Sequence, residues 1–283
     1  MKIFSLLLTY LILIPYAGAC NPPKDISRIT VAGGSITEIV YLLNMESHLV
    51  AVDITSNYPQ AAKALPSIGY VRNLSAEGIL SLNPTVIIGE DDMGPEDVLT
   101  QIKVAGVDMF IVEEQYSAMG IIRKIECVAD ILGKRKLADD LINEELLPKT
   151  NRLEILAASN LVSPPKILFI LSMQSGSPIV AGNSVSADGL IKMIGGINAM
   201  RSFEGWKPVG TEPIIKSNPD VIIISNRGLI GFGDISDLKS HPALRFTAAV
   251  KNKKVFVVDG MEMLGFGPRT LSLAATLAEK ITR

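Results

Sequence analysis

Short apolar runs alternate with longer amphipathic segments through most of the chain. The short runs are rich in β-branched residues and are typical of buried strands, whereas apolar side chains that recur every three or four positions are typical of helices. In the first half this pattern predicts strands at 28–32, 49–54, 85–89 and 108–112, and helices at 36–43 and 95–105. Strands that alternate with helices predict a parallel, doubly wound α/β lobe.

The middle of the chain has a helical pattern without strand-like runs. Helical periodicity covers 117–132, then resumes at 134–158 with an interruption near Pro148. The prolines Pro164 and Pro165 cannot continue a helix and end this part of the chain. A segment this rich in helix predicts a stiff connector rather than a floppy linker.

The last part of the chain returns to the α/β pattern, with predicted strands at 166–171, 220–225 and 254–258 and a final helix at 268–281. The expected fold class is therefore α/β, with two Rossmann-like lobes joined by a long connector helix. The expected boundaries are 28–133 for the N-terminal lobe, 134–163 for the connector and 164–283 for the C-terminal lobe.

The two lobes share an internal repeat. The segment from Glu77 to Ile88 aligns with the segment from Glu212 to Ile223 at a constant offset, 212 − 77 = 135, and Glu, Ile, Asn, Pro, Val, Ile and Ile recur in register. Each copy reads as a helix start, an Asn-Pro stop and a β-branched strand. The repeat predicts two lobes that are built alike.

The N-terminus has the pattern of an export signal. Lys2 precedes an apolar run at 3–14 that is too short to span a bilayer, and Ala17-Gly18-Ala19 matches an A-x-A cleavage signal. Cleavage after Ala19 makes 1–19 a signal peptide, exports the chain to the periplasm and leaves Cys20 as the first residue. A lipid on Cys20 and a soluble product both remain open, because Ala17 stands where lipoproteins usually have leucine.

Composition excludes several classes of function. The formal net charge of −2 over 283 residues gives no electrostatic footprint for nucleic acid, and two histidines do not suggest a clustered zinc site. Cys20 and Cys127 are too few for a disulfide framework, and Cys127 is expected to be a small buried apolar residue on a helix. Neither G-x-S-x-G nor a Cys/His pair with recognisable spacing occurs, so an enzyme is not expected.

Tyr70 and Arg72 form the most distinctive chemical pair in the chain. They lie two positions apart in a segment of extended character, so both side chains are expected on the same face. A guanidinium beside a phenol favours the phenolate, which makes Tyr70 a candidate anionic oxygen ligand for a hard metal ion.

Four segments carry a resemblance to a known family. They are Gly-Tyr-Val-Arg followed by Leu-Ser-Ala-Glu-Gly at 69–78, Leu-Ser and Gly-Ser-Pro with Ala-Gly at 171–182, Arg-Gly-Leu at 227–229, and Leu-Gly-Phe-Gly-Pro-Arg-Thr at 264–270. With them the chain resembles the haem-binding proteins that supply bacterial haem-uptake ABC transporters. These form a branch of the class III solute-binding proteins, which also carry cobalamin and siderophores.

The resemblance implies a ligand, ferric haem b, and roles for several residues. Tyr70 would be the axial ligand of the haem iron, with Arg72 beside it, and Arg227 would pair with a haem propionate. Met173 stands where some relatives have a histidine; we interpret it as apolar cover over the porphyrin. Met261 and Phe266, with Met263 and Leu264, are expected either to line the ligand site or to pack in the core.

The resemblance also implies a partner, the permease dimer of an ABC transporter in the inner membrane. Glu77 and Glu212, at equivalent helix starts in the repeat, match the acidic pair with which this class docks onto the permease. The alternative ligands are a ferric siderophore or cobalamin. The number of haems, one or two, and a role for Trp206 near the ligand or the hinge stay open.

Overall fold

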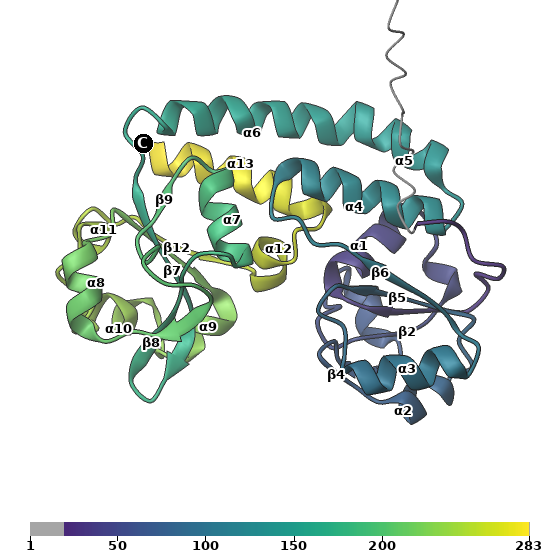
Figure 1. Ribbon diagram of the computed structural model, residues 1–283. Coiled ribbons are helices and arrows are strands. Elements are labelled where there is room, and N and C mark those ends of the chain that lie inside the picture. The colour runs from purple at the N-terminus through teal and green to yellow at the C-terminus, as the bar shows by residue number, and fades with distance from the viewer. Residues whose placement is uncertain (1–19, 283) are drawn as a thin grey trace, which may run out of the picture.

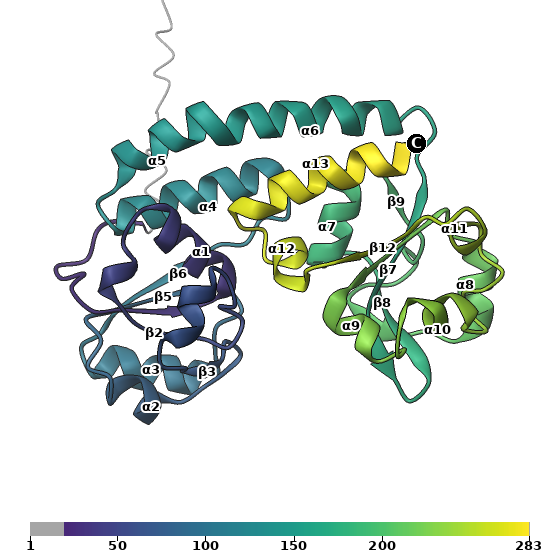
Figure 2. The ribbon, with the colours of Figure 1, turned by 180° about the vertical axis from the view of Figure 1, so that it is seen from behind.

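The computed structural model describes residues 20–282, so the predicted leader at 1–19 lies outside the described residues. Two α/β lobes lie side by side, and long helices run along one side of both (Figures 1 and 2). The two-lobed α/β fold predicted from the sequence is confirmed.

The N-terminal lobe is built on a four-stranded parallel sheet with the strand order β2-β1-β5-β6. A two-stranded antiparallel hairpin, β3–β4, lies apart from that sheet. The strands are β1 (Ile29–Ala32), β2 (Leu49–Val52), β3 (Gly69–Tyr70), β4 (Asn73–Leu74), β5 (Val86–Glu90) and β6 (Asp108–Val112). The helices are α1 (Gly34–Leu42), α2 (Ala76–Leu80) and α3 (Glu96–Val104), with short 3₁₀ turns at Glu46–His48 and Gln60–Ala64.

The C-terminal lobe has a six-stranded sheet in which β10, β8, β7, β11 and β12 follow one another and β9 also pairs with β7. Unlike the first sheet it is mixed, because β8 is antiparallel to both β7 and β10. The strands are β7 (Lys166–Gln174), β8 (Ser177–Ala181), β9 (Ile197–Asn198), β10 (Trp206–Pro208), β11 (Val221–Ser225) and β12 (Val255–Val258). The helices are α7 (Ser186–Met193), α8 (Thr211–Ser217), α9 (Asn226–Ile230), α10 (Ile235–Ser240), α11 (Ala248–Lys251) and α12 (Gly260–Leu264).

The connector combines several helical segments. After α4 (Ala118–Ile131) come α5 (Arg135–Leu141), a π-helical turn at Ile142–Leu146 and α6 (Leu147–Asn160). Pro148 lies in the first turn of α6, directly after the π-helical turn. The last helix, α13 (Pro268–Thr282), packs against α6 and also contacts α1 and α4 (Figure 1). Through α13 the connector is therefore braced against both lobes.

The internal repeat is present in the structure. β5 begins at Val86 and β11 at Val221, which is the offset of 135 seen in the sequence. Asn83 and Asn218, the equivalent residues before the prolines, both adopt the left-handed backbone conformation, with φ of 48° and 42°. Asparagine tolerates this conformation better than most residues, so each copy uses the same turn from helix to strand.

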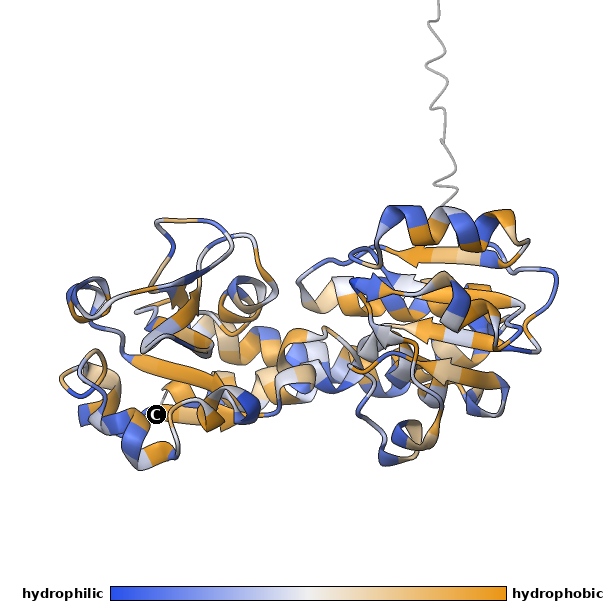
Figure 3. Ribbon diagram, turned by 90° about the horizontal axis from the view of Figure 1, so that it is seen from below, coloured by the Kyte–Doolittle hydropathy of each residue, from blue (hydrophilic) through white to orange (hydrophobic). Residues whose placement is uncertain are grey.

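Both faces of each sheet are covered by buried apolar side chains. The largest cluster continues from one lobe to the other, and includes Ile36 of α1, Ile125 of α4, Phe169 of β7 and Leu271 of α13. Two further clusters cover the opposite faces of the two sheets. Apolar residues concentrate on the strands (Figure 3). Among the helices of residues 20–282, none combines the length and the apolar character needed to cross a membrane.

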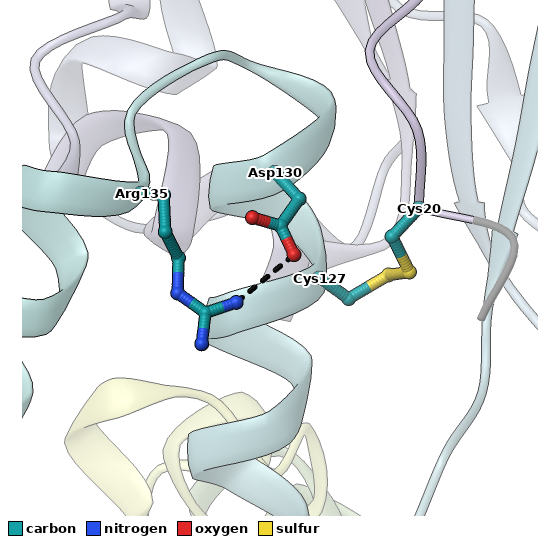
Figure 4. The surroundings of a disulfide bond; sticks show 4 residues. All are labelled: Cys20, Cys127, Asp130 and Arg135. Atoms are coloured by element: carbon teal, nitrogen blue, oxygen red, sulfur yellow. Dashed lines mark hydrogen bonds and ion pairs between the residues drawn. A yellow bond between two sulfur atoms is a disulfide. The ribbon is translucent and has the colours of Figure 1, made fainter. Parts of the chain in front are cut away.

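One expectation about a particular residue needs correction. Cys127 is not a free buried thiol, because it forms a disulfide with Cys20 (Figure 4). Trp206, whose role the sequence left open, lies in strand β10, and its ring packs edge-on against Phe169 at a centroid distance of 5.7 Å. The sequence missed the disulfide because its partners are 107 residues apart and no local pattern connects them.

Candidate functional site

Tyr70 lies in strand β3, on the side of the N-terminal lobe that faces the C-terminal lobe (Figure 2). Antiparallel pairing of Tyr70 with Asn73 holds its backbone. The side chain remains 39% exposed, and its hydroxyl has no hydrogen-bond partner within residues 20–282. Tyr70 thus has an accessible phenol on a strand at this side of the lobe.

Arg72 is held by a carboxylate from a different part of the lobe. Its Nε and Nη2 atoms lie 2.7 and 2.5 Å from Oδ2 of Asp92, which follows β5. Burial acts to lower the pKa of Arg72, but the hydrogen bond and charge of Asp92 outweigh it, and the nearby phenols of Tyr70 and Tyr116 act in the same direction. Arg72 therefore stays charged beside both phenols, although its fork is bound by Asp92 and not by Tyr70.

Tyr116 is a residue of this site that the sequence analysis missed. It lies between β6 and α4, is 41% exposed, and its ring packs against Phe266 of the C-terminal lobe at a centroid distance of 5.2 Å. Burial, followed by the charges of Glu114, Asp91, Asp92 and Glu90, raises its pKa. Tyr116 thus lies where the two lobes meet, close enough to Arg72 for their charges to interact. No local motif marks it.

Arg227 and Met173 come from neighbouring elements of the C-terminal lobe. Arg227 lies in α9, on the side of that lobe facing the N-terminal lobe (Figure 2), and its exposed guanidinium makes no hydrogen bond or ion pair with any described residue. Met173 is half-buried near the end of β7, against the end of α9 at Gly231. A free guanidinium and an apolar side chain on two elements in contact suit an acidic, largely apolar ligand.

The residues predicted at 261–266 lie at the contact between the lobes. Phe266 is fully buried in the core, the packing role that the sequence left open. Met261 is half-buried, and its methyl group lies 2.6 Å from the position that a Cβ at Gly34 would take. The same Cβ would lie 2.7 Å from the backbone carbonyl oxygen of Thr55, which cannot move aside as a side-chain methyl can, so Gly34 has to be glycine.

A buried lysine joins three parts of the molecule at this contact. Lys124 of α4 is 2% exposed, and its Nζ donates to Ser35 Oγ of α1 at 3.0 Å and to the carbonyl oxygen of Gly265 at 3.1 Å. It also forms an ion pair with Glu114. Ser35 in turn donates to Glu90 Oε1 at 2.7 Å. Lys124 thus links the first lobe, the start of the connector and the second lobe.

An ion pair also crosses this contact. Arg269 of α13 donates from Nη2 to Glu38 Oε1 of α1 at 2.7 Å, and its guanidinium stacks on the ring of Tyr58, 3.9 Å from the centroid. Burial raises the pKa of Glu38 in spite of the hydrogen bond and charge of Arg269. Asp259 and Glu262 surround the same guanidinium from the C-terminal lobe.

Glu90 gives a prediction about pH. Burial raises its pKa from 4.5 to about 7; the charge of Lys124 opposes this shift and that of Glu114 adds to it. The folded protein holds the proton of the Glu90 carboxyl more tightly than the unfolded chain does. The stability that this proton contributes is present below pH 4.5 and is lost as the pH rises through about 7. Over this range of pH, the free energy of unfolding, measured with urea, is expected to fall more steeply with pH for the native protein than for Glu90→Gln.

The exposed Glu96 at the start of α3 offers a matched control for this experiment. Glu96→Gln is expected to follow the pH dependence of the native protein. If Glu90→Gln also follows it, Glu90 has no raised pKa in the fold.

The two acidic residues predicted to dock on a transporter lie at equivalent places in the two lobes. Glu77 is in the first turn of α2 and Glu212 in the first turn of α8, and both are exposed. Their helices lie in different lobes, well separated along the molecule (Figure 1). Each lobe therefore carries one of the two exposed carboxylates.

Comparison with known proteins places this architecture in a family. A family model described as periplasmic binding protein matches residues 29–261. The periplasmic heme-binding protein BhuT, in complex with two hemes, is 33% identical with a TM-score of 0.81, and the match covers 90% of this chain and 97% of that one. The periplasmic heme-binding protein RhuT from Roseiflexus sp. RS-1, in apo form, is also 33% identical with a TM-score of 0.81, over 92% and 100% of the two chains.

Curated relatives are more diverse. An uncharacterized ABC transporter substrate-binding lipoprotein, YvrC of Bacillus subtilis (strain 168), is 25% identical over 91% of this chain and 81% of its own length. The vitamin B12-binding protein of Yersinia pestis (strain Pestoides F) is 24% identical over 72% of this chain and 71% of its own. The chain therefore belongs to the periplasmic binding protein family, has the class III fold, and is a substrate-binding protein of an ABC transporter rather than a member of an enzyme family.

Proposed function

We propose that this protein captures ferric haem b between its two lobes and delivers it to the permease dimer of an inner-membrane ABC transporter. The observation that carries the proposal is Tyr70, an exposed phenol without a hydrogen-bond partner in the described residues, on strand β3 at the side of the N-terminal lobe that faces the other lobe. The similarity to two heme-binding proteins, each 33% identical over nearly the whole chain, supports the same ligand.

The site residues would divide the work between the iron and the periphery of the porphyrin. Ferric iron is a hard ion that prefers an anionic oxygen, and Tyr70 supplies one, with the positive charge of Arg72 nearby. Arg227 would pair with a propionate, because its guanidinium is exposed and unpaired within the described chain. Met173 and Met261, both half-buried, would give the ring apolar contacts, whereas Phe266 would have to leave its buried position to reach it.

Replacing Tyr70 with phenylalanine tests the iron ligand. Hemin titrated into Tyr70→Phe is expected to give no tyrosinate-to-iron charge-transfer absorption, and the affinity is expected to fall by more than about tenfold, because one iron–oxygen bond is lost while the ring remains. Visible absorption during the titration measures both quantities.

Tyr116 supplies a control of matched chemistry, because it is equally exposed and also near Arg72. Tyr116→Phe is expected to keep the charge-transfer absorption. If Tyr116→Phe loses the absorption and Tyr70→Phe retains it, the iron ligand is Tyr116 and the assignment to Tyr70 is wrong.

Cobalamin or a ferric siderophore is the second candidate ligand, since a curated relative is named for vitamin B12. Isothermal titration of the purified protein with hemin and with cyanocobalamin separates the two. Tight binding of cyanocobalamin without binding of hemin would favour the second candidate.

Delivery would use Glu77 and Glu212, one on each lobe, to contact positively charged residues of the two permease subunits. Both carboxylates are exposed and available for this contact. Each also stabilises the N-terminus of its own helix by about 0.3–1 kcal/mol, and this local role is compatible with docking.

A further inference from the structure

The N-terminal segment of the described chain is fastened to the N-terminal lobe. Cys20 forms a disulfide with Cys127 in the middle of α4, with the two Cα atoms 5.2 Å apart (Figure 4). Cys20 and Ile26 also pack against the main apolar core. The eight residues between Cys20 and β1 (28 − 20 = 8) therefore connect the disulfide directly to a strand of the sheet.

The disulfide occupies the atom that a lipid anchor would need. Lipidation of an N-terminal cysteine forms a thioether at Sγ, and the Sγ of Cys20 is already bonded to the Sγ of Cys127. One sulfur atom cannot carry both bonds, so the two modifications exclude each other. Packing of Cys20 and Ile26 against the core also removes the flexible tether by which a lipid-anchored protein stands away from its membrane.

We propose that Cys20 is a disulfide-forming residue and not a lipidation site, so that this protein diffuses freely in the periplasm, unlike its lipoprotein relative. The Cys20 and Cys127 thiols together lose two protons and two electrons to a protein disulfide of the oxidising periplasm, which becomes a dithiol. The proposal does not depend on which ligand the protein carries.

The test uses the full precursor expressed in a Gram-negative host and recovered from the periplasm by osmotic shock. Without reductant, the unfolded native protein is expected to have no alkylatable thiol and an intact mass two hydrogens below that of the reduced chain beginning at Cys20. Reduction is expected to yield two thiols. Cys127→Ser is expected to yield one thiol without reductant, which identifies the partner.

Three results would overturn the proposal. One is an added lipid mass on Cys20, with the native protein in the membrane fraction. Another is two free thiols in the native protein without reductant. The third is a mature chain that begins after Cys20, because Cys127 would then have no partner within the molecule.

Discussion

Replacing Lys124 with methionine is expected to lower the free energy of unfolding by about 3–5 kcal/mol, the usual cost of removing one partner of a buried ion pair. Methionine fills a similar volume, so the loss comes from charge and hydrogen bonding rather than from a cavity. Glu114 would lose its counterion, and the hydrogen bonds to Ser35 and to the Gly265 carbonyl would be lost.

Urea unfolding measures this loss, followed by two signals that report on different parts of the molecule. The only tryptophan, Trp206, lies in β10 of the C-terminal lobe, so its fluorescence reports on that lobe, whereas far-ultraviolet circular dichroism reports on both. Because Lys124 links both lobes, the two transitions are expected to shift together. A shift in circular dichroism alone would limit the role of Lys124 to the first lobe.

Lys136 is a matched control, because it is an exposed lysine in α5, the next helix of the same connector. Lys136→Met is expected to change the free energy of unfolding by less than about 0.5 kcal/mol, as is usual for surface substitutions. Equal losses of unfolding free energy in Lys136→Met and Lys124→Met would show that the loss in Lys124→Met does not come from its buried ion pair.

The buried position of Lys124 has a signal in the sequence. Lys124 follows Ile121 by three positions, and Ile125 and Val128 continue the apolar face of α4. A lysine within such a face is either buried with a partner or at the edge of the face. The helix predicted at 117–132 therefore contained the signal for a buried charge, but the identity of its partners depended on the tertiary fold.

Local features of the fold were predictable because local chemistry determines them. Ser117 caps α4 by accepting a hydrogen bond from the N–H of Gly120, and the helix ends at Ile131 just before Gly133, close to the predicted 117–132. The mixed character of the second sheet was not predictable in this way. Antiparallel β8 follows β7 through a turn at Ser175 and Gly176, both with positive φ, and the sequence analysis did not recognise that hairpin.

The site was only partly predictable for the same reason. Tyr70 and Arg72 lie in one short segment, so their proximity could be inferred from the sequence. The expected extended conformation was wrong, because Arg72 lies in the turn between β3 and β4. Asp92, which holds Arg72, is 20 residues further on, and Tyr116 reaches the same neighbourhood from beyond β6. Their approach depends on β5 and β6 lying side by side in the sheet, which brings residues after both strands to the same edge.

Removing the disulfide is expected to lower the stability of the N-terminal lobe by about 2–5 kcal/mol. Cys20 and Cys127 are 107 residues apart, and the loop they close contains the whole four-stranded sheet. A cross-link over about 100 residues restricts the unfolded chain by about 4.7 kcal/mol in the chain-entropy model. The double variant Cys20→Ser, Cys127→Ser avoids free thiols, and its urea unfolding is followed by circular dichroism and by hydrogen exchange of the β1 and β5 amides.

The native protein unfolded in the presence of a reductant is the control for the two serine substitutions, because it lacks the bond but keeps both sulfur atoms. Both samples are expected to lose the same stability in the first lobe, while the Trp206 fluorescence transition of the second lobe moves less, since the closed loop contains no strand of the second sheet. An unchanged first-lobe transition in both samples would mean that the cross-link restricts the unfolded chain very little. A larger loss in the second lobe would instead show that removal of the disulfide also weakens the contact between the lobes, where Lys124 of α4 donates to the Gly265 carbonyl.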